Sequence, residues 1–205
     1  MAKTIWIAAL VAGASYTLVG WSDLSGAGVI VWKGAGVGLL AIWAAMTARD
    51  GDGRLLAAAL ALGAIGDVLL EAVSLIVGAI AFLAGHIAYI VLFARHRRAA
   101  MSRSQRLLGW IIAPATTLIA ALLSRDAGVA IYAAGLGSMA ALAWTSRFPR
   151  YRVGMGAMLF VASDLILFAR IGGFGSWELL IWPTYFAGQA LIAWGAGRVL
   201  AASAR

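Results

Sequence analysis

Long apolar runs, separated by short polar or glycine-containing segments, make up nearly the whole chain. A helix of about 20 residues crosses the hydrocarbon core of a bilayer, and eight runs reach roughly that length. We expect membrane-spanning helices at roughly 4–21, 27–46, 55–72, 75–94, 107–123, 127–145, 153–172 and 178–199. The connections between them are short, so no separate soluble domain is expected. The pattern predicts an all-α, polytopic membrane bundle of eight transmembrane helices, with residues 1–205 as a single domain.

The composition supports this interpretation and excludes several kinds of chemistry. Hydrophobic residues make up 63% of the chain and charged residues only 12%, and the mean hydropathy of +0.94 is too high for a soluble domain of this size. The chain has no cysteine. Disulfides, thiolate nucleophiles and cysteine-ligated metals are therefore excluded, and any active site must be built from the helices themselves.

The formal charge of +8 follows the predicted topology and does not indicate a nucleic-acid partner. With the amino terminus inside, 13 of the 16 basic residues fall on the cytoplasmic side. These are Lys3, Arg49, Arg54, Arg95, Arg97, Arg98, Arg103, Arg106, Arg147, Arg150, Arg152, Arg198 and Arg205. Only Arg125 and Arg170 fall on the opposite side, and Lys33 lies within a span. The positive-inside rule then predicts an integral multi-pass protein of a bacterial cytoplasmic (inner) membrane with both termini in the cytoplasm.

Five ionisable residues interrupt the apolar runs: Lys33, Asp67, Glu71, His86 and Asp164. Charges are costly in hydrocarbon, so such residues usually face the interior of a bundle and mark a functional site. Helical rise places Lys33, Asp67, His86, Asp164, Tyr185 and Gln189 roughly 9 to 17 Å below the predicted outer boundary. We therefore expect these side chains to converge on one cavity.

The spacing of the polar residues indicates which of them lie on the same helix face. Asp67 and Glu71 are four residues apart, as are Tyr185 and Gln189, and Tyr89 follows His86 by three residues. Residues at these spacings share one helix face. Two interpretations remain open. One is a buried network in which Lys33 neutralises a carboxylate and locks the bundle. The other is a reaction site.

The residue types favour acid–base chemistry over other mechanisms. Ser163 lies beside Asp164 without the turn motif of a serine hydrolase. A metal site normally recruits several ligands, and His86 is the only histidine within a predicted span. We expect no metal and no cofactor. Paired carboxylates remain, since one can hold a proton while the other is ionised, which suits hydrolysis by water.

An internal duplication is one further interpretation of the pattern. Gly66-Asp67-Val68-Leu69-Leu70 in the third span resembles Ser163-Asp164-Leu165-Ile166-Leu167 in the seventh. Two parallel four-helix repeats would bring one aspartate from each half toward a shared axis, whereas chance similarity between apolar helices explains the match equally simply. Pro114 and Pro183 are expected to bend their helices.

Four blocks of sequence resemble the YhhN family, the lysoplasmalogenases, and the resemblance covers essentially the whole chain. The blocks are Gly66-Asp67-Val68-Leu69-Leu70, Ala81-Phe82-Leu83-Ala84-Gly85-His86-Ile87-Ala88-Tyr89, Gly156-Ala157-Met158-Leu159-Phe160-Val161-Ala162-Ser163-Asp164 and Thr184-Tyr185-Phe186-Ala187-Gly188-Gln189-Ala190-Leu191-Ile192. Two positions depart from the family pattern. Lys33 is followed by Gly34 and Ala35 where the family usually has proline and leucine, and Glu71 has no counterpart.

The resemblance implies an ether hydrolase that cleaves the vinyl ether bond of lysoplasmalogens, giving a fatty aldehyde and a glycerophospho-ethanolamine or -choline. The lysophospholipid substrate would enter from the bilayer, and membrane lipids are the other expected partners. Asp67 and Asp164 are the expected catalytic pair. The expected substrate-binding or orienting residues are Lys33, Glu71, His86, Tyr89, Tyr185 and Gln189. The alternatives are a proton-coupled transporter or lipid flippase that uses the same buried residues, and a purely structural or regulatory membrane protein.

Overall fold

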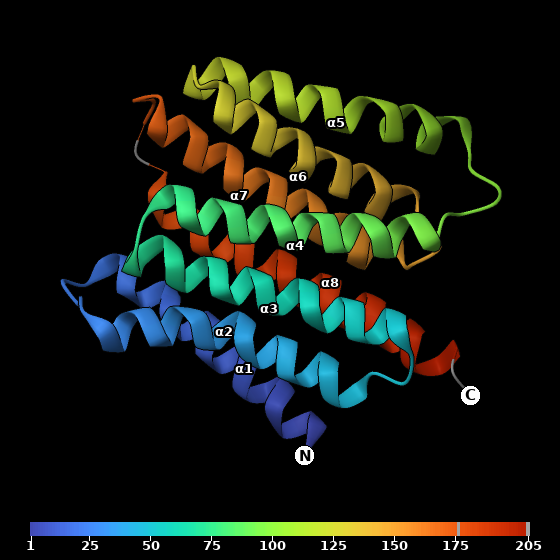
Figure 1. The fold of residues 1–205 in the computed structure, drawn as a ribbon, viewed down its shortest axis with the longest axis horizontal. Coiled ribbons are helices and arrows are strands. Elements are labelled where there is room, and N and C mark those ends of the chain that lie inside the picture. Colours follow the sequence, from blue (N-terminus) through green and yellow to red (C-terminus); the bar gives the residue numbers. More distant parts are fainter. Residues whose placement is uncertain (176, 204–205) are drawn as a thin grey trace. The chain divides into compact units, whose positions relative to one another are not determined.

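The structure, a computed structural model, describes residues 1–175 and 177–203, and within this range it is almost entirely helical (Figure 1). The α-helices are α1 (Ala2–Tyr16), α2 (Ala27–Thr47), α3 (Gly51–Ala72), α4 (Leu75–Arg95), α5 (Arg103–Ser124), α6 (Ala127–Thr145), α7 (Met155–Ile171) and α8 (Ile181–Ser203). Short 3-10 or π turns occur at η1 (Thr17–Trp21), η2 (Arg150–Gly154) and η3 (Glu178–Leu180). The predicted all-helical membrane bundle is confirmed. Arg205, placed in the cytoplasm by the sequence, lies outside the described residues.

Seven helices in the described part of the chain have the length and apolarity of a membrane span. These segments are Ala2–Trp21, Ala27–Thr47, Gly51–Ala72, Leu75–Arg95, Arg103–Ser124, Ala127–Thr145 and Arg150–Ile171. They make this an integral multi-pass membrane protein. The eighth helix, α8, has 23 residues, which is also long enough to span, but it carries Gln189 and Arg198 and is less apolar.

Side-chain caps explain where three helices begin. Asp50 Oδ1 accepts a hydrogen bond from the Gly53 amide at 2.7 Å, and Asp126 caps α6 in the same way at 2.9 Å. Ser102 forms a reciprocal capping box with Gln105 at the start of α5. Helices α3 and α5 each begin four residues before the apolar runs predicted them to begin, because their capped first turns are polar and the hydropathy pattern does not register them.

The chain forms two compact units, and α4 and α8 each contribute to both. Unit 1 comprises residues 1–89 and 193–203 of the described chain. Within it, α2 packs along α1 and α3 (Figure 1). Trp6, Trp43 and Trp194 join α1, α2 and α8, with ring centroids of Trp6 at 4.7 and 4.8 Å from the other two. Such aromatic contacts stabilise the packing of these helices by more than the burial of their apolar area alone.

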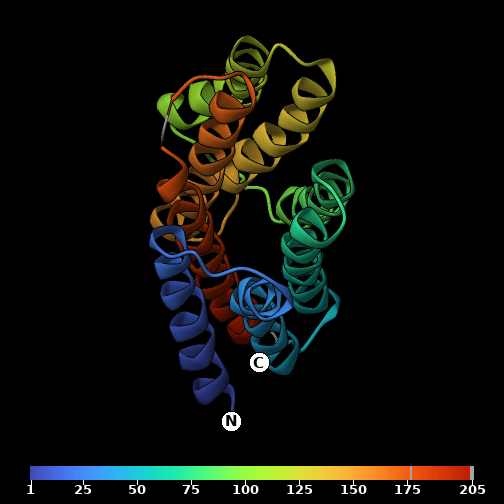
Figure 2. The same ribbon diagram turned by 90° about the vertical axis from the view of Figure 1, so that its left-hand side faces the viewer.

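Unit 2 comprises residues 90–192. Its helices α5 and α6 pack along each other, and α7 contacts both, as the green, gold and orange helices of Figure 2 show. Helices α7 and α8 cross closely. A Cβ atom at Gly156 would lie 2.6 Å from the Gly188 carbonyl oxygen, and a Cβ atom at Gly188 would lie 2.6 Å from the Gly156 carbonyl oxygen. Small residues are what allow helix backbones to approach this closely.

Pro114 and Pro183 occupy different helix positions. Pro114 lies inside α5, as expected. Pro183 lies in the first turn of α8, where its missing N–H would have had no helical partner. The expected bends at Pro114 and Pro183 stay predictions. The predicted duplication stays a prediction.

Candidate functional site

The polar cluster of unit 1 begins with an ion pair between α2 and α3. Lys33 Nζ donates a hydrogen bond to Glu71 Oε1 at 2.7 Å, and their side chains are 14% and 42% exposed. Asp67 lies one turn before Glu71 on the same helix and is buried, at 2% exposed. The structure thus brings Lys33 together with Glu71, the carboxylate that the family resemblance did not include.

The end of α1 adds a tyrosine that sequence reasoning missed. Tyr16 lies within electrostatic reach of Glu71 and Asp67, and its ring packs edge-on against Trp32 at 6.1 Å between centroids. Trp32 Nε1 donates hydrogen bonds to the Ala12 carbonyl and the Ser15 hydroxyl, both at 3.1 Å. These contacts tie α1 to α2 and orient the Tyr16 ring.

His86 and Tyr89 lie on the part of α4 that belongs to unit 1, and each is only 1% exposed. Their helix packs closely on α3. A Cβ atom at Gly66 would lie 2.8 Å from the Phe82 ring, and one at Gly85 would lie 3.2 Å from the Ala59 carbonyl oxygen. The predicted burial of both polar side chains within the bundle is confirmed.

In unit 2, Asp164 has a specific partner. The Tyr132 hydroxyl, from α6, donates a hydrogen bond to Asp164 Oδ2 at 2.9 Å. The Tyr132 ring packs edge-on against Phe168, one turn after Asp164 on α7, with centroids 5.9 Å apart. Asp164 is 7% exposed, so this bond satisfies a buried carboxylate oxygen and fixes its direction.

Tyr132 was absent from the predicted site, although its depth pointed to it. It lies five residues after the start of α6, and Asp164 lies seven residues before the end of α7. At about 1.5 Å per residue, the two positions lie roughly 8 and 10 Å from neighbouring helix ends. A tyrosine at the level of a buried acid on the next helix was therefore a readable signal.

Ser163, beside Asp164, has a structural partner. Its hydroxyl donates a hydrogen bond to the Ile181 carbonyl at 2.8 Å and the residue is fully buried. Ile181 opens α8, so Ser163 ties α7 to the beginning of α8. This arrangement agrees with the rejection of a serine nucleophile.

Tyr185 and Gln189 lie one turn apart on α8, both buried at 4% and 1% exposed. Gln189 Nε2 lies at hydrogen-bond distance from the Tyr185 hydroxyl, at 3.4 Å. The Tyr185 ring is held edge-on by Phe160, with centroids 4.9 Å apart, and is flanked by Trp182 at 5.6 Å. The predicted shared face of Tyr185 and Gln189 is confirmed, and aromatic packing orients its phenol.

A model of the YhhN family matches residues 28–196. The chain belongs to the YhhN family. The matched segment contains every residue of the predicted site, from Lys33 to Gln189, and also Tyr132. Neither the curated proteins nor the solved structures contain a significant match to this chain.

The YhhN-family site is rich in hydrogen-bonding groups and poor in metal ligands. Residues 1–175 and 177–203 contain no group of three or more histidine, aspartate or glutamate side chains placed to hold a metal ion. Each unit contains one buried aspartate that interacts with a tyrosine. Tyr16 interacts electrostatically with Asp67, and the Tyr132 hydroxyl donates a hydrogen bond to Asp164. A carboxyl group and a phenol can together hold, donate and accept protons.

Proposed function

We propose that this YhhN-family protein is a lysoplasmalogenase-like hydrolase that cleaves the vinyl ether bond of lysoplasmalogens within the membrane. The observation that supports it most strongly is the family match across residues 28–196, which includes both buried aspartates. The substrate class also suits the location of Asp67 and Asp164. A lysophospholipid with one long chain partitions into the bilayer, so a buried site among helices is accessible to its vinyl ether.

The reaction needs proton donation and water activation, and no redox step. A proton is added to the vinyl carbon farther from oxygen, which gives an oxocarbenium ion. Water adds to the carbon bound to oxygen and loses a proton to a carboxylate. The resulting hemiacetal collapses to a fatty aldehyde, and the glycerol oxygen leaves with a proton as the free hydroxyl of the glycerophospho-base. One vinyl ether and one water are consumed.

We assign the proton transfers to Asp67 and Asp164 as a coupled set, without dividing the two roles between them. A protonated carboxyl donates to carbon, and an ionised carboxylate stabilises the cation and activates water, as paired carboxylates do in glycosidases. In this proposal Tyr132 positions Asp164 through its 2.9 Å hydrogen bond. His86, Tyr89, Tyr185 and Gln189 orient water or the substrate oxygen, and the Lys33–Glu71 pair shapes the electrostatic field near Asp67.

The deciding experiment compares lysophospholipids of the same chain length and headgroup that differ only in linkage. Purified protein in detergent is incubated with the vinyl ether, alkyl ether and ester forms, and aldehyde and fatty acid are quantified. We expect aldehyde from the vinyl ether alone. In heavy water, the aldehyde should carry one deuterium at the carbon next to the carbonyl, because protonation occurs there.

The assay in detergent also distinguishes a hydrolase from a transporter. A proton-coupled transporter or flippase makes no product in micelles, where there are no two compartments, and instead moves the lipid across proteoliposome membranes. Absence of aldehyde in micelles together with lipid movement in proteoliposomes would replace the hydrolase with the transporter. Release of fatty acid from the ester would replace vinyl ether cleavage with a lysophospholipase activity.

A further inference from the structure

One end of unit 2 is strongly basic and has no carboxylate of its own. The arginines at the end of α4, the start of α5, the end of α6 and the start of α7 are Arg95, Arg97, Arg98, Arg103, Arg106, Arg147, Arg150 and Arg152. Between residues 90 and 163 the only acidic residue is Asp126, which caps α6 at its opposite end. Asp164 accepts from Tyr132 and Glu178 pairs with Arg170. No carboxylate of unit 2 therefore neutralises this end.

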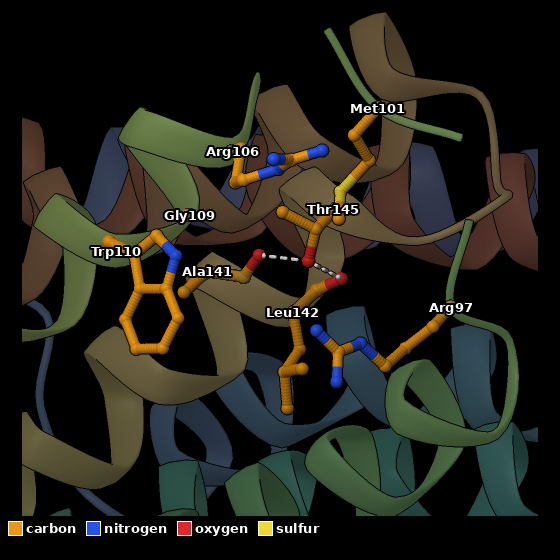
Figure 3. Close-up of a pocket in the computed structure, with 8 residues that line it drawn as sticks. All are labelled: Arg97, Met101, Arg106, Gly109, Trp110, Ala141, Leu142 and Thr145. Atoms are coloured by element: carbon orange, nitrogen blue, oxygen red, sulfur yellow. Dashed lines mark hydrogen bonds between the residues drawn. The ribbon is translucent and has the colours of Figure 1, made fainter. Parts of the chain in front are cut away.

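A pocket of about 300 Å³ lies at this basic end, between α5, α6 and the segment after α4. Figure 3 shows Arg97 and Arg106 entering it from two sides of Leu142 and Thr145, with Trp110 at one edge. Its floor is set by close helix packing, since a Cβ atom at Gly109 would lie 2.6 Å from Thr145 Cγ2. The Thr145 hydroxyl donates to the Ala141 carbonyl at 2.8 Å. The two guanidinium groups are thus the charged donors that this pocket offers.

Both arginines are carried by ordered backbone. The segment after α4 is tied to the end of α6 by the Arg147 amide, which donates to the His96 carbonyl at 2.7 Å, and by the Arg98 amide, which donates to the Thr145 carbonyl at 3.2 Å. These bonds flank Arg97, which forms a β-bridge with Ser146. Arg106 lies in the first turn of α5, behind the Ser102 capping box. The backbone positions from which the two arginines reach the pocket are therefore fixed by the fold.

Other groups at the same end of unit 2 also lack acceptors. Gln105 Nε2, Trp144 Nε1 and Arg150 Nε are buried N–H donors that have no hydrogen-bond acceptor among the described residues. Unpaired buried donors are uncommon because each is costly. An excess of donors and positive charge, with no carboxylate of unit 2 at this end, indicates an anionic ligand.

The face beside the pocket is suited to acyl chains. On α5, Leu107, Trp110 and Ile111 are 61%, 76% and 46% exposed, although they lie in an apolar membrane helix. Tryptophan favours the boundary between headgroups and hydrocarbon, and basic pockets between helices bind anionic headgroups. From charge, cavity and apolar face together, we propose that Arg97 and Arg106 bind the phosphate of an anionic diacyl phospholipid whose chains lie along α5.

This lipid site is separate from the proposed reaction centre. Thr145 at the pocket and Tyr132 at Asp164 are 13 residues apart on α6, which is about 20 Å along a helix. The bound lipid is thus a fixed partner of unit 2 and is not the lysolipid undergoing hydrolysis. Its binding can be measured whether or not the protein releases aldehyde.

The test is native mass spectrometry of the full-length protein in detergent with added phosphatidylglycerol or phosphatidylcholine of identical chains. We expect one phosphatidylglycerol to bind in preference to phosphatidylcholine. At about 1 kcal/mol per arginine, R97Q or R106Q should weaken this binding about fivefold and the double variant roughly thirtyfold. The matched control is R103Q/R147Q, which removes the same charge from exposed arginines of the same end that do not line the pocket.

Three outcomes would overturn the proposal. The first is unchanged phosphatidylglycerol binding in R97Q, R106Q and the double variant. The second is an equal loss in R103Q/R147Q, which would indicate diffuse charge attraction and no defined site. The third is full displacement of the lipid by an equal concentration of inorganic phosphate, which would make a free anion the occupant. Each single variant removes one exposed side chain, so the result does not depend on the double variant folding.

Discussion

Two carboxylates are buried within the apolar helices of this protein. Asp67 and Asp164 are 2% and 7% exposed, and an ionisable group at such a position is expensive unless its environment uses it. The Tyr132 hydrogen bond to Asp164 provides a defined partner on a neighbouring helix. These side chains are where substitutions should change chemistry without changing the fold.

Replacing either aspartate by asparagine keeps the side-chain volume and removes the proton-transfer group. We expect D67N and D164N each to lower the rate of aldehyde release at least about a hundredfold, the lower range for loss of general acid–base catalysis. The control is D23N, at an exposed loop position between α1 and α2. Normal turnover in both buried variants, with D23N also normal, would remove the two aspartates from the mechanism.

Loss of the Tyr132 hydroxyl is predicted to have a smaller effect on catalysis than loss of either aspartate. Y132F keeps the ring contact with Phe168 and deletes the donor to Asp164. A hydrogen bond to a charged group contributes about 1.5 to 3 kcal/mol, so kcat should fall about ten- to a hundredfold, with KM nearly unchanged. Y151F removes a hydroxyl from a residue that is 78% exposed at the other end of unit 2 and should leave kcat unchanged. A change in KM alone would assign Tyr132 to substrate binding instead.

Residue types and spacing identified most of the buried polar residues of the candidate site, but they did not identify two tyrosines, Tyr16 and Tyr132. Lys33, Asp67 and Asp164 stand out because charge is rare in apolar runs. Residue type alone does not distinguish Tyr16 and Tyr132, since tyrosine is common near membrane boundaries, and only the depth of Tyr132 relative to Asp164 gave a signal. Their importance comes from which helix lies next to theirs, as the Tyr132–Asp164 bond shows.

Hydropathy determines where the helices lie along the sequence, and side-chain caps determine where several of them begin. The apolar runs predicted all eight α-helices, while the capped first turns of α3 and α5 were missed because Asp50 and Ser102 act through hydrogen bonds and not through hydropathy. Helix crossings depend on individual glycines. The mutual approach of Gly156 and Gly188 holds α7 against the part of α8 that carries Tyr185 and Gln189.

A methyl group at this crossing should therefore destabilise the protein. In G188A the new Cβ would lie 2.6 Å from the Gly156 carbonyl oxygen and 3.1 Å from the Phe160 amide nitrogen. Overpacking costs about 1 to 3 kcal/mol, against a gain of about 1 kcal/mol in helix propensity. We expect a lower thermal unfolding temperature in detergent, and reduced turnover because Tyr185 and Gln189 shift.

The matched control is G38A, where the nearest heavy atom to the new Cβ is Ala64 Cβ at an ordinary 3.8 Å. Its unfolding temperature should stay the same or rise, because only the propensity gain remains. If G38A were destabilised more than G188A, the α7–α8 crossing would not be the tighter contact.

For the chain as a whole, the arginine distribution predicts that both termini lie in the cytoplasm. This requires α8 to cross the membrane although it is less apolar than the seven other spans. The absence of cysteine allows a direct test with single-cysteine variants. The positions S25C, A99C and S203C are exposed in the structure and follow α1, follow α4 and end α8.

In intact cells, a membrane-impermeant maleimide should label S25C, and it should label A99C and S203C only after permeabilisation. Labelling of S203C from outside would show that α8 does not cross and that the chain has seven spans. Labelling of A99C from outside, with S25C protected, would invert the whole topology.

The membrane class, the number of helices and the family follow from local properties of the chain. Burial of apolar runs in lipid and the four ordered blocks are readable one segment at a time, because hydropathy and motif spacing need no knowledge of neighbours. The partners of the buried groups depend on neighbours in space. Lys33 with Glu71, Tyr132 with Asp164, and the arginine pocket of unit 2 arise only when neighbouring helices pack side by side. Helix packing in lipid is set by close fits of small residues and by buried hydrogen bonds, and neither leaves a periodic signal along the chain.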